Sequence, residues 1–475
     1  MKKLLLLVPL ALCAQVQVDT VIRLPRRPSP DFYLRTVAYL PELNKLYVAY
    51  DPDRYYVVDC STYQVVDSIW ADTYGGAYYA WNWRRLKLYA LNAADADSTL
   101  VIDAAADTIT CRLGVYYRMP SQVYLSDVDR LYRAADDTLY AFDGATDSVV
   151  RRKTLGGSNS NAEWDSAGRK LYVGQGTTKE LYVYDYVADS VLKVIDVSGV
   201  GGMQPDALLF SYACHKAYLA PFQIEPGASN VGIIDTEHDT MVGVLPMPIW
   251  GGLHYRSAVD ERDGKVYLAA SDGDTLWVVS CATDSVLRKI EYGQGGARLL
   301  RWVPWSNRLY FVKGAGYPHS TCIEVLDCRT DSFIGTRVLP NSGLIQDIQL
   351  DPVRQRIFVV GVDTFDIYVL RDTGYGVAED KPAMPRLASG LHLQPTPGGY
   401  DIRYSTASPC RVDLSVYDLT GREVKRLVAE KQPAGQRSVV WNRTDGNGTA
   451  VARGVYFFRL DTPGFRSVKK AVVAR

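Results

Sequence analysis

The stretch KLYVAYDPDRYYVVDCSTYQVVDSI, residues 45–69, contains the pattern on which the fold prediction rests. Its first four residues belong to an anchor that recurs in variant forms along the chain. Eight copies of a unit of about 44 residues are typical of a chain built from similar modules. The apolar residue that opens each anchor stands at Leu46, Leu88, Leu131, Leu171, Ala217, Val266, Leu309 and Ile357.

Each unit reads as four short strands, A to D, with the anchor as strand B. Asp and Thr side chains bond to nearby backbone groups, so the polar residues between strands C and D predict a tight hairpin. A large apolar residue marks strand A seven positions before each anchor, at Tyr39, Trp81, Tyr124, Trp164, Phe210, Val259, Trp302 and Leu350. Strand C usually ends at an aspartate, at Asp59, Asp103, Asp143, Asp185, Asp235 and Asp327. Strand D opens at Asp107, Asp147, Asp189, Asp239, Asp284 and Asp331, with Tyr63 in the first unit.

The eighth unit ends after IYVLRDTGYG, residues 367–376, without a strand D. The N-terminal segment VDTVIRLP, residues 18–25, has the sequence of the missing strand. A ring of sheets is closed when this strand joins the last three, which also covers an exposed sheet edge. The prediction is an all-β chain with an eight-bladed β-propeller over residues 15–373. A seven-bladed ring is the alternative, and it leaves this strand unexplained.

The repeat resembles that of the YVTN-type bacterial propellers, which carry an LYV…V-x-D-x-x-T…V pattern. The resemblance covers residues 17–373 and implies the fold. It says little about function, because one fold serves many functions. The usual YVTN ring has seven blades, so eight units are a departure.

The spacing of the strands separates the two faces of the predicted disc. The A-to-B and C-to-D offsets are constant, whereas the B-to-C and D-to-A connections vary in length. Because successive strands alternate in direction, the constant turns share one face and the variable loops share the other. Variable loops are where binding usually occurs. Aromatic residues with a few polar groups suit a sugar or peptide, and the candidate ligand-binding residues are Tyr74, Tyr116, Tyr117, Arg118, Phe222, Trp250, His254, Tyr255, Tyr317 and His319.

The repeat is lost after residue 373, and residues 374–385 read as a linker. Residues 386–475 then hold seven short strand-like segments, which predict an Ig-like sandwich. The residues LSVYDLTGREVKRL from Leu414, Trp441, and TDGNGTAVARGVYFFRL ending at Leu460 resemble the Ig-like module shared by type IX sorting domains and the flagellar hook-capping protein. The resemblance implies export or surface attachment of the propeller through the secretion machinery or the cell envelope.

The N-terminus MKKLLLLVPLALCA, residues 1–14, reads as a secretory signal peptide, with a basic start and a short apolar run. The run is too short to cross a bilayer, and no other apolar run is long enough to do so. Lipidation at Cys13 is an open alternative. We therefore expect a secreted or cell-surface protein of a Gram-negative-type bacterium, with a periplasmic location as the alternative. The cysteines are scattered without a CxxC pair and read mostly as buried small residues, and the sequence leaves their pairing open.

Composition and motifs narrow the range of functions. The formal net charge is zero, which argues against nucleic acid as the main partner. No nucleophile elbow, zinc-protease motif, phosphate loop or calcium loop is present, so we expect no cofactor and no metal site.

The leading hypothesis is a non-enzymatic binding scaffold whose variable face engages a glycan, a peptide or a surface protein. One alternative is an extracellular lyase or hydrolase acting on polysaccharide or peptide. In that case His254 would act as acid, His319 as base and Arg118 as the charge-stabilising group. A further alternative is a purely structural surface protein.

Overall fold

The structure is a computed structural model of the 475-residue chain, which divides into two compact units with a boundary between Gly376 and Val377. It describes residues 16–25, 34–50, 54–71, 79–91, 98–114, 121–157, 159–175, 178–200, 205–221, 230–247, 256–269, 274–293, 296–313, 322–339, 345–361, 366–372, 391–396, 399–406, 410–418, 422–432, 435–462 and 465–473.

The described residues of the first unit form eight four-stranded antiparallel sheets, which confirms the all-β propeller prediction. The elements of this unit whose bounds fall within the described residues are strands and one short 3-10 helix, η2 (Ser198–Val200). In chain order these strands are β1 (Val16–Arg23), β2 (Leu34–Leu40), β3 (Lys45–Tyr50), β4 (Arg54–Asp59), β5 (Gln64–Trp70), β6 (Tyr79–Asn82), β7 (Lys87–Leu91), β8 (Ser98–Asp103), β9 (Thr108–Gly114), β10 (Ser121–Leu125), β11 (Arg130–Ala135), β12 (Thr138–Asp143), β13 (Val149–Thr154), β14 (Asn159–Asp165), β15 (Lys170–Gln175), β16 (Glu180–Asp185), β17 (Ser190–Asp196), β18 (Pro205–Ser211), β19 (Lys216–Pro221), β20 (Val231–Asp235), β21 (Thr240–Leu245), β22 (Ser257–Asp260), β23 (Lys265–Ala269), β24 (Thr275–Ser280), β25 (Ser285–Glu291), β26 (Ala297–Val303), β27 (Arg308–Lys313), β28 (Cys322–Asp327), β29 (Ser332–Val338), β30 (Ile345–Asp351), β31 (Arg356–Gly361) and β32 (Asp366–Asp372).

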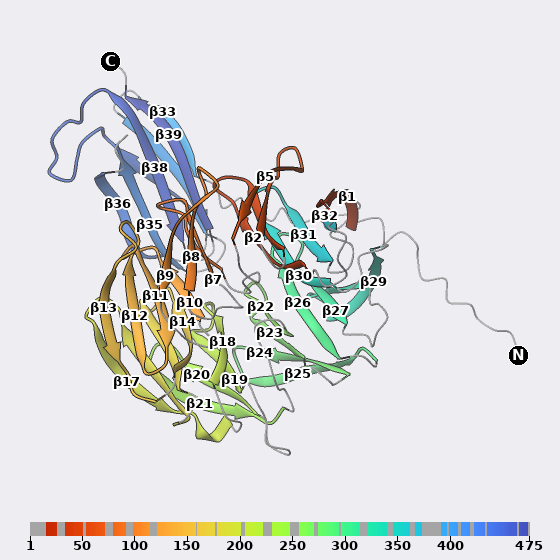
Figure 1. Ribbon diagram of the computed structural model, residues 1–475. Helices are drawn as coiled ribbons and strands as arrows, with labels where there is room; N and C mark the ends of the chain where they lie inside the picture. The colour runs from red at the N-terminus through yellow and green to blue at the C-terminus, as the bar shows by residue number, and fades with distance from the viewer. Residues whose placement is uncertain are drawn as a thin grey trace, which may run out of the picture. The chain divides into compact units, whose positions relative to one another are not determined.

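The first strand of each sheet lies toward the centre of the ring and the fourth lies at the outside. Figure 1 shows β14, β18, β22, β26 and β30 around the centre, with β13, β17, β21, β25 and β29 at the periphery. We number the sheets one to eight from the sheet of β2, and the eighth contains β30.

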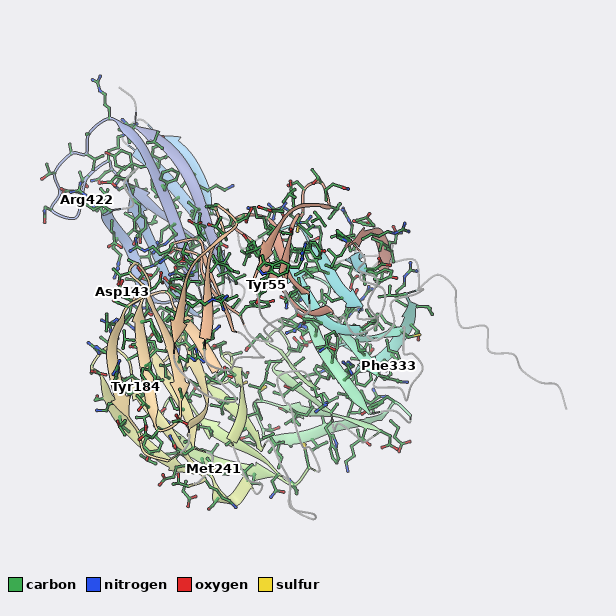
Figure 2. All side chains as sticks on the ribbon, viewed as in Figure 1. Tyr55, Asp143, Tyr184, Met241, Phe333 and Arg422 are labelled. Carbon is green, nitrogen blue, oxygen red and sulfur yellow. The ribbon has the colours of Figure 1, made fainter. Side chains whose placement is uncertain are left out.

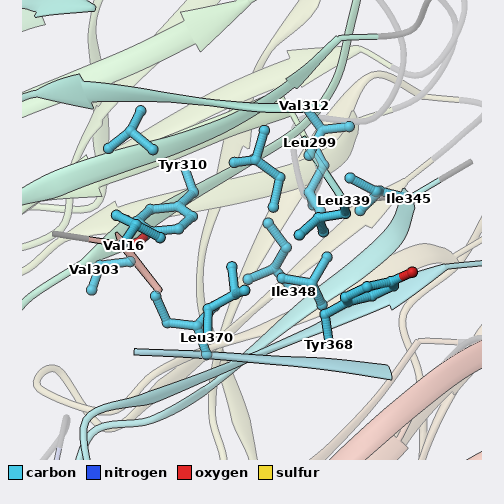
Figure 3. Packing of buried hydrophobic residues seen from close by; sticks show 14 residues of the cluster. Val16, Leu299, Val303, Tyr310, Val312, Leu339, Ile345, Ile348, Tyr368 and Leu370 are labelled. Atoms are coloured by element: carbon cyan, nitrogen blue, oxygen red, sulfur yellow. The ribbon is translucent and has the colours of Figure 1, made fainter. Parts of the chain in front are cut away.

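The closing sheet combines the two ends of the first unit, as the sequence predicts. β1 pairs antiparallel with β32, from Val16 opposite Asp372 to Arg23 opposite Asp366. Val16 and Ile22 are 6% and 1% exposed, so this strand contributes side chains to the core. Figure 3 shows Val16 packed beside Tyr310 and Leu370 of the seventh and eighth sheets.

Successive sheets are joined by hydrophobic clusters. Among the described residues, eight clusters each contain side chains from two neighbouring sheets, and one of them joins the eighth sheet to the first. The second strand of each sheet is covered on both sides, which explains its apolar sequence. Leu46, Tyr47, Val48 and Ala49 are all 0% exposed. Figure 2 shows side chains filling the spaces between the sheets, Tyr55 among them.

The tryptophans of the innermost strands belong to these clusters, but they are not the deepest residues. Trp81, Trp164 and Trp302 are partly buried at the edges of their clusters. Their indole N–H groups donate to Glu42 Oε2 at 2.7 Å, Tyr186 Oη at 3.3 Å and Asn307 Oδ1 at 3.0 Å. An indole at the rim of a cluster can bury its ring and keep a polar partner for its nitrogen.

The second unit is a two-sheet sandwich of seven strands among its described residues. One sheet has the order β33-β34-β37 and the other β36-β35-β38-β39. The strands are β33 (His392–Thr396), β34 (Gly399–Thr406), β35 (Cys410–Tyr417), β36 (Glu423–Gln432), β37 (Gly435–Trp441), β38 (Gly454–Thr462) and β39 (Phe465–Val473). The segment TDGNG, residues 444–448, lies between β37 and β38, which belong to different sheets. It forms a local turn in which Asp445 Oδ1 accepts from the amides of Asn447 and Thr449.

Candidate functional site

All ten sequence-predicted ligand residues lie outside the described residues. They fall in the D-to-A or B-to-C connections of the sequence. They remain predictions: Tyr74, Tyr116, Tyr117, Arg118, Phe222, Trp250, His254, Tyr255, Tyr317 and His319.

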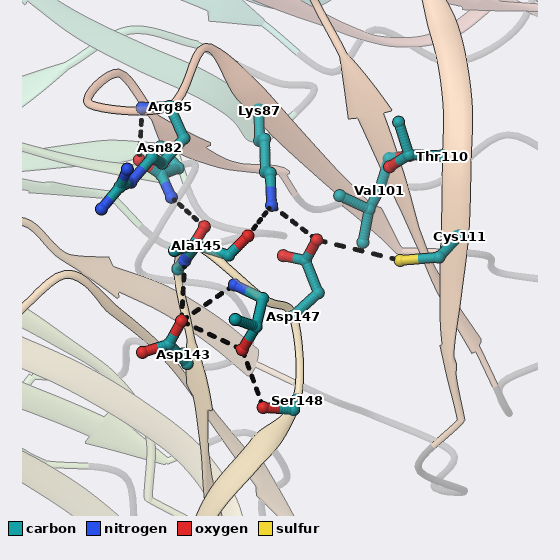
Figure 4. A network of polar contacts seen from close by, with 12 residues as sticks. Asn82, Arg85, Lys87, Val101, Thr110, Cys111, Asp143, Ala145, Asp147 and Ser148 are labelled. Atoms are coloured by element: carbon teal, nitrogen blue, oxygen red, sulfur yellow. Dashed lines mark hydrogen bonds and ion pairs between the residues drawn. The ribbon is translucent and has the colours of Figure 1, made fainter. Parts of the chain in front are cut away.

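The opposite face, formed by the A-to-B and C-to-D turns, is held together by its own polar groups. The aspartate that ends strand C bonds to the turn that follows it. Asp143 Oδ1 accepts from the amides of Ala145 at 3.0 Å and Thr146 at 2.8 Å (Figure 4). These bonds hold the pKa of Asp143 below its ordinary value. The sequence prediction of turns capped by aspartate is therefore confirmed.

The aspartate that opens strand D has a second role, which the sequence analysis missed. It forms an ion pair with the lysine that opens strand B of the preceding sheet, as Asp147 does with Lys87. Asp147 has a φ of 58°, a left-handed conformation that aspartate tolerates better than most residues. The five pairs of this kind, with N–O distances of 2.6 to 2.8 Å, are Lys45–Asp107, Lys87–Asp147, Lys170–Asp239, Lys216–Asp284 and Lys265–Asp331.

The tyrosine of the anchor completes this contact in four of the five sheet pairs. Tyr172 Oη donates to Asp239 Oδ1 at 2.6 Å, beside the lysine of the same strand. Burial raises the pKa of Tyr172 above its ordinary range, so the phenol stays protonated and donates. The other three pairs are Tyr47–Asp107, Tyr89–Asp147 and Tyr267–Asp331.

In the seventh and eighth sheets, the residue that opens strand B is an arginine in place of the lysine. Arg308 of the seventh sheet pairs with Asp372 of the eighth at 2.6 Å, and both side chains are at most 1% exposed. Arg356 of the eighth sheet donates to the carbonyl of Cys60 and to the hydroxyl of Tyr63 in the first sheet. The sequence contained one indication of the Arg356 contact. The first unit has Tyr63 where the other units have the aspartate that opens strand D, so a lysine at position 356 would find no acid there to pair with.

The charged side chains of the turns on this face pair with one another. A ligand-binding surface is therefore better sought where the innermost strands begin. Those starts lie on the opposite, variable-loop face. Two arginines stand there in neighbouring sheets: Arg256 directly precedes β22, and Arg298 is the second residue of β26. Sequence analysis missed them, because a single arginine at the start of a strand has no motif.

The two arginines link three successive innermost strands. Arg256 Nε donates to the carbonyl of Ala297 at 2.9 Å, and Arg298 Nε donates to the carbonyl of Ile345 at 2.9 Å. Arg298 Nη2 also donates to the side-chain oxygen of Gln346. Burial, and to a lesser extent the charge of Arg256, lower the pKa of Arg298 below its ordinary value.

A third arginine continues the contacts into the closing sheet. Arg301 Nε donates to the carbonyl of Ile348 at 3.1 Å, and its Nη2 lies 3.7 Å from Asp347 Oδ1. Asp347 is 7% exposed, and burial raises its pKa despite this arginine. This carboxylate also accepts from the Ile348 amide at 2.7 Å, so we regard it as a structural link and not as a catalytic acid.

A buried polar cluster lies between the second and third sheets. Arg133 stands where the other anchors carry an apolar residue, and it is 0% exposed. Its Nη1 donates to Thr99 Oγ1 at 2.8 Å, and Thr99 donates to Gln122 Oε1 at 3.0 Å. Gln122 in turn donates to the carbonyl of Tyr89 at 3.0 Å. These bonds account for a polar chain inside the core.

No metal site emerges from the part of the chain that the structure describes. It contains no group of three or more His, Cys, Asp or Glu side chains placed to hold an ion. Its seven cysteines are unpaired thiols, of which Cys60, Cys281 and Cys328 are buried. None of its helices is long and apolar enough to cross a membrane.

The second unit has a recognisable sequence family. Residues 396–462 match the FlgD Ig-like domain. This FlgD-like domain covers a small part of the chain, so it characterises the C-terminal unit only. No curated protein matches the chain.

Solved structures support the fold assignment. The chain is similar to "Structure of Dos1 propeller", with a TM-score of 0.57 and 13% identity over 78% of this chain and 97% of that one. It is also similar to BamB from Moraxella catarrhalis, with a TM-score of 0.55 and 9% identity over 75% and 99%. The dihydro-heme d1 dehydrogenase NirN in complex with DHE gives 0.55 and 13% over 92% and 81%. At these identities the likeness establishes the propeller fold alone.

Proposed function

We propose that this protein is an exported binding scaffold whose propeller presents a ligand-binding surface on its variable-loop face. The observation that carries the proposal is the difference between the two faces. The aspartates and lysines of the constant turns bond to each other across five sheet pairs. On the other face, Arg298 has only neutral acceptors as hydrogen-bond partners among the described residues.

The ligand class proposed is a glycan, a peptide or a surface protein. The test is a thermal-shift and pull-down series on the full chain, with neutral and acidic oligosaccharides, peptides and cell-envelope extracts. A ligand that binds the folded state alone raises the melting temperature with its occupancy. The proposal fails if no small ligand raises the melting temperature and no envelope protein binds.

The FlgD-like domain is proposed to route or anchor the propeller at the cell surface, after export directed by residues 1–14. The support is the family match over residues 396–462 and the signal-like N-terminal sequence. A fusion of residues 386–475 to an exported reporter tests this role in a host that has a type IX system. A reporter retained in the periplasm would contradict sorting, while cell fractionation of the full chain tests the location.

A further inference from the structure

Two cysteines of neighbouring sheets lie at one boundary on the face of the constant turns. Cys214 is in the A-to-B turn of the fifth sheet, between β18 and β19, and Cys281 directly follows β24 of the sixth sheet. Cys281 is a member of the hydrophobic cluster that joins these two sheets, and Cys214 packs against that cluster. The two thiols are far apart in the sequence and share one interface in the fold.

The backbone contacts place Cys281 directly opposite the segment that carries Cys214. The carbonyl of Gly264, in the sixth sheet, accepts from the amide of Cys281 at 2.9 Å. A Cβ atom at Gly264 would lie 3.8 Å from Cys214 Sγ, so the side chain of Cys214 extends across the boundary to this glycine. Lys216, two residues after Cys214, donates from Nζ to the carbonyl of Cys281 at 2.8 Å.

The two thiol groups also contact each other and differ in exposure. Burial, and to a smaller extent a side-chain hydrogen bond with Cys214, raise the pKa of Cys281 to about 11. Cys281 is 0% exposed, so it stays protonated and is shielded from dissolved reagents. Cys214 is partly exposed, and it is therefore the thiol of the two that a reagent reaches first.

The next boundary, between the sixth and seventh sheets, has the same layout without the second cysteine. Cys328 follows β28 as Cys281 follows β24, and its amide donates to the carbonyl of Asn307 at 3.2 Å. Asp263 stands at the turn position that Cys214 has in the fifth sheet, and its Oδ2 accepts from Asn307 Nδ2 at 2.9 Å. A side chain at this turn position thus contacts the next sheet in both places.

We propose that Cys214 and Cys281 are a modification site, at which a disulfide forms between the fifth and sixth sheets. This inference goes beyond the proposed function, because it concerns the opposite face and needs no ligand of the variable loops. The oxidant is an external disulfide, carried by a small molecule or by an oxidoreductase, which an oxidising compartment outside the cytoplasm supplies.

Two thiol–disulfide exchange steps balance the reaction. Cys214 Sγ attacks one sulfur of the external disulfide, which forms a mixed disulfide and releases a thiol that takes the proton of Cys214. Cys281 Sγ then attacks Cys214 Sγ, which forms the internal disulfide and releases a second thiol with the proton of Cys281. The two cysteines lose two electrons and two protons, and the external disulfide gains them.

The test uses the folded full chain with oxidised glutathione as the probe. After the remaining thiols are blocked, the protein is digested without reduction and the linked peptides are identified by mass spectrometry. Cys214→Ser is the test variant, because it changes a partly exposed turn residue and leaves Cys281 in the core. Cys328→Ala is the matched control, since Cys328 is a buried thiol at the equivalent position of the seventh sheet. Each variant is first checked for a cooperative melting transition.

We expect a linked Cys214–Cys281 peptide from wild type and from Cys328→Ala, and none from Cys214→Ser. A cross-link between distant positions restricts the unfolded chain, so the melting temperature of wild type should rise by about 5 °C or more and fall again with dithiothreitol. The melting temperature of Cys214→Ser should not respond. A mixed disulfide that persists on Cys214 would overturn the proposal, because an adjacent thiol would resolve it. Linkage of Cys281 to a different cysteine, or no linked peptide at all, would overturn it as well.

Discussion

Lys87 Nζ lies 2.6 Å from Asp147 Oδ2, and this contact joins the second strand of one sheet to the C-to-D turn of the next. The same amine donates to the carbonyl of Ala145 at 3.0 Å, and Tyr89 Oη donates to Asp147 Oδ1 at 3.0 Å. One carboxylate thus satisfies two donors from the neighbouring sheet, and Figure 4 shows the contact with Lys87. The same lysine–aspartate contact recurs in five sheet pairs. This recurrence explains why the anchor and the C-to-D turn stand at regular positions within the repeat.

Substitution of Asp147 by Asn should destabilise the propeller by about 1 to 3 kcal/mol, because Lys87 loses its counter-charge in a largely buried place. Urea unfolding of the full chain measures this loss. Asp136→Asn is the control, since Asp136 also has a positive φ, of 47°, but is exposed. Equal effects of the two substitutions would mean that turn conformation, and not the ion pair, sets the stability.

Substitution of Ile22 by Ala should cost about 2 to 5 kcal/mol, which is the usual range for removing a buried aliphatic side chain. Ile22 is 1% exposed and packs between the eighth and first sheets. Val66→Ala on the outer strand β5 is the control, because Val66 is 53% exposed. If Ile22→Ala were as mild as the control, β1 would not belong to the core.

Asp260 should make the propeller less stable as the pH rises. Its carboxyl is 0% exposed, and burial raises its pKa to about 6, above the ordinary value near 4. Folding favours the protonated form, so this side chain costs nothing below about pH 4, and its penalty grows through about pH 6. Above that pH the penalty stays in full.

Asp260→Asn should remove this pH-dependent penalty and stabilise the fold at pH 8 by up to about 3 kcal/mol. The amide keeps an oxygen for the backbone N–H groups of Arg262 and Asp263, which bond to Asp260 Oδ1. Unfolding curves at pH 4, 6 and 8 give the comparison, with Asp136→Asn as reference. A variant less stable than wild type at pH 8 would show that the ionised carboxylate is favourable.

Trp441 should control the melting of the FlgD-like domain. It is 0% exposed, packs on Tyr400 and Phe458, and donates from Nε1 to the carbonyl of Thr444 at 2.8 Å. Trp441→Ala should cost about 3 to 5 kcal/mol. Scanning calorimetry of the full chain should show one transition moved down, while Val440→Ala, at a 62% exposed neighbour, leaves it in place. A shift of the propeller transition instead would contradict two separate cores.

The architecture followed from the sequence because it depends on periodic, local signals. The constant distance from Tyr39 to Leu46 predicts a hairpin within one sheet, and the missing strand D of the eighth unit predicts the pairing of β1 with β32. Both predictions depend on the positions of apolar residues in the sequence, because alternation of apolar and polar residues indicates a strand directly.

The polar contacts could not be predicted in the same way. Lys87 and Asp147 are 60 residues apart, and nothing in the spacing shows that a turn aspartate faces the next sheet. Arg256 and Arg298 each contact the next sheet because innermost strands of neighbouring sheets lie side by side, which a one-dimensional pattern does not show. The predicted residues His254 and Tyr255 precede this pair in the sequence and lie outside the described residues.

The strand β1 also sets the order in which the propeller can be completed. Val16 pairs with Asp372, so one of the first segments to leave the ribosome must wait for nearly the whole unit before it finds its partner. Contacts between such distant positions slow folding, because a long loop must close first. Until then, β1 has no partner strand, and the edge of β32 that faces away from β31 is unpaired. A chain that emerges gradually from a ribosome therefore cannot close its ring until β32 is available to pair with β1.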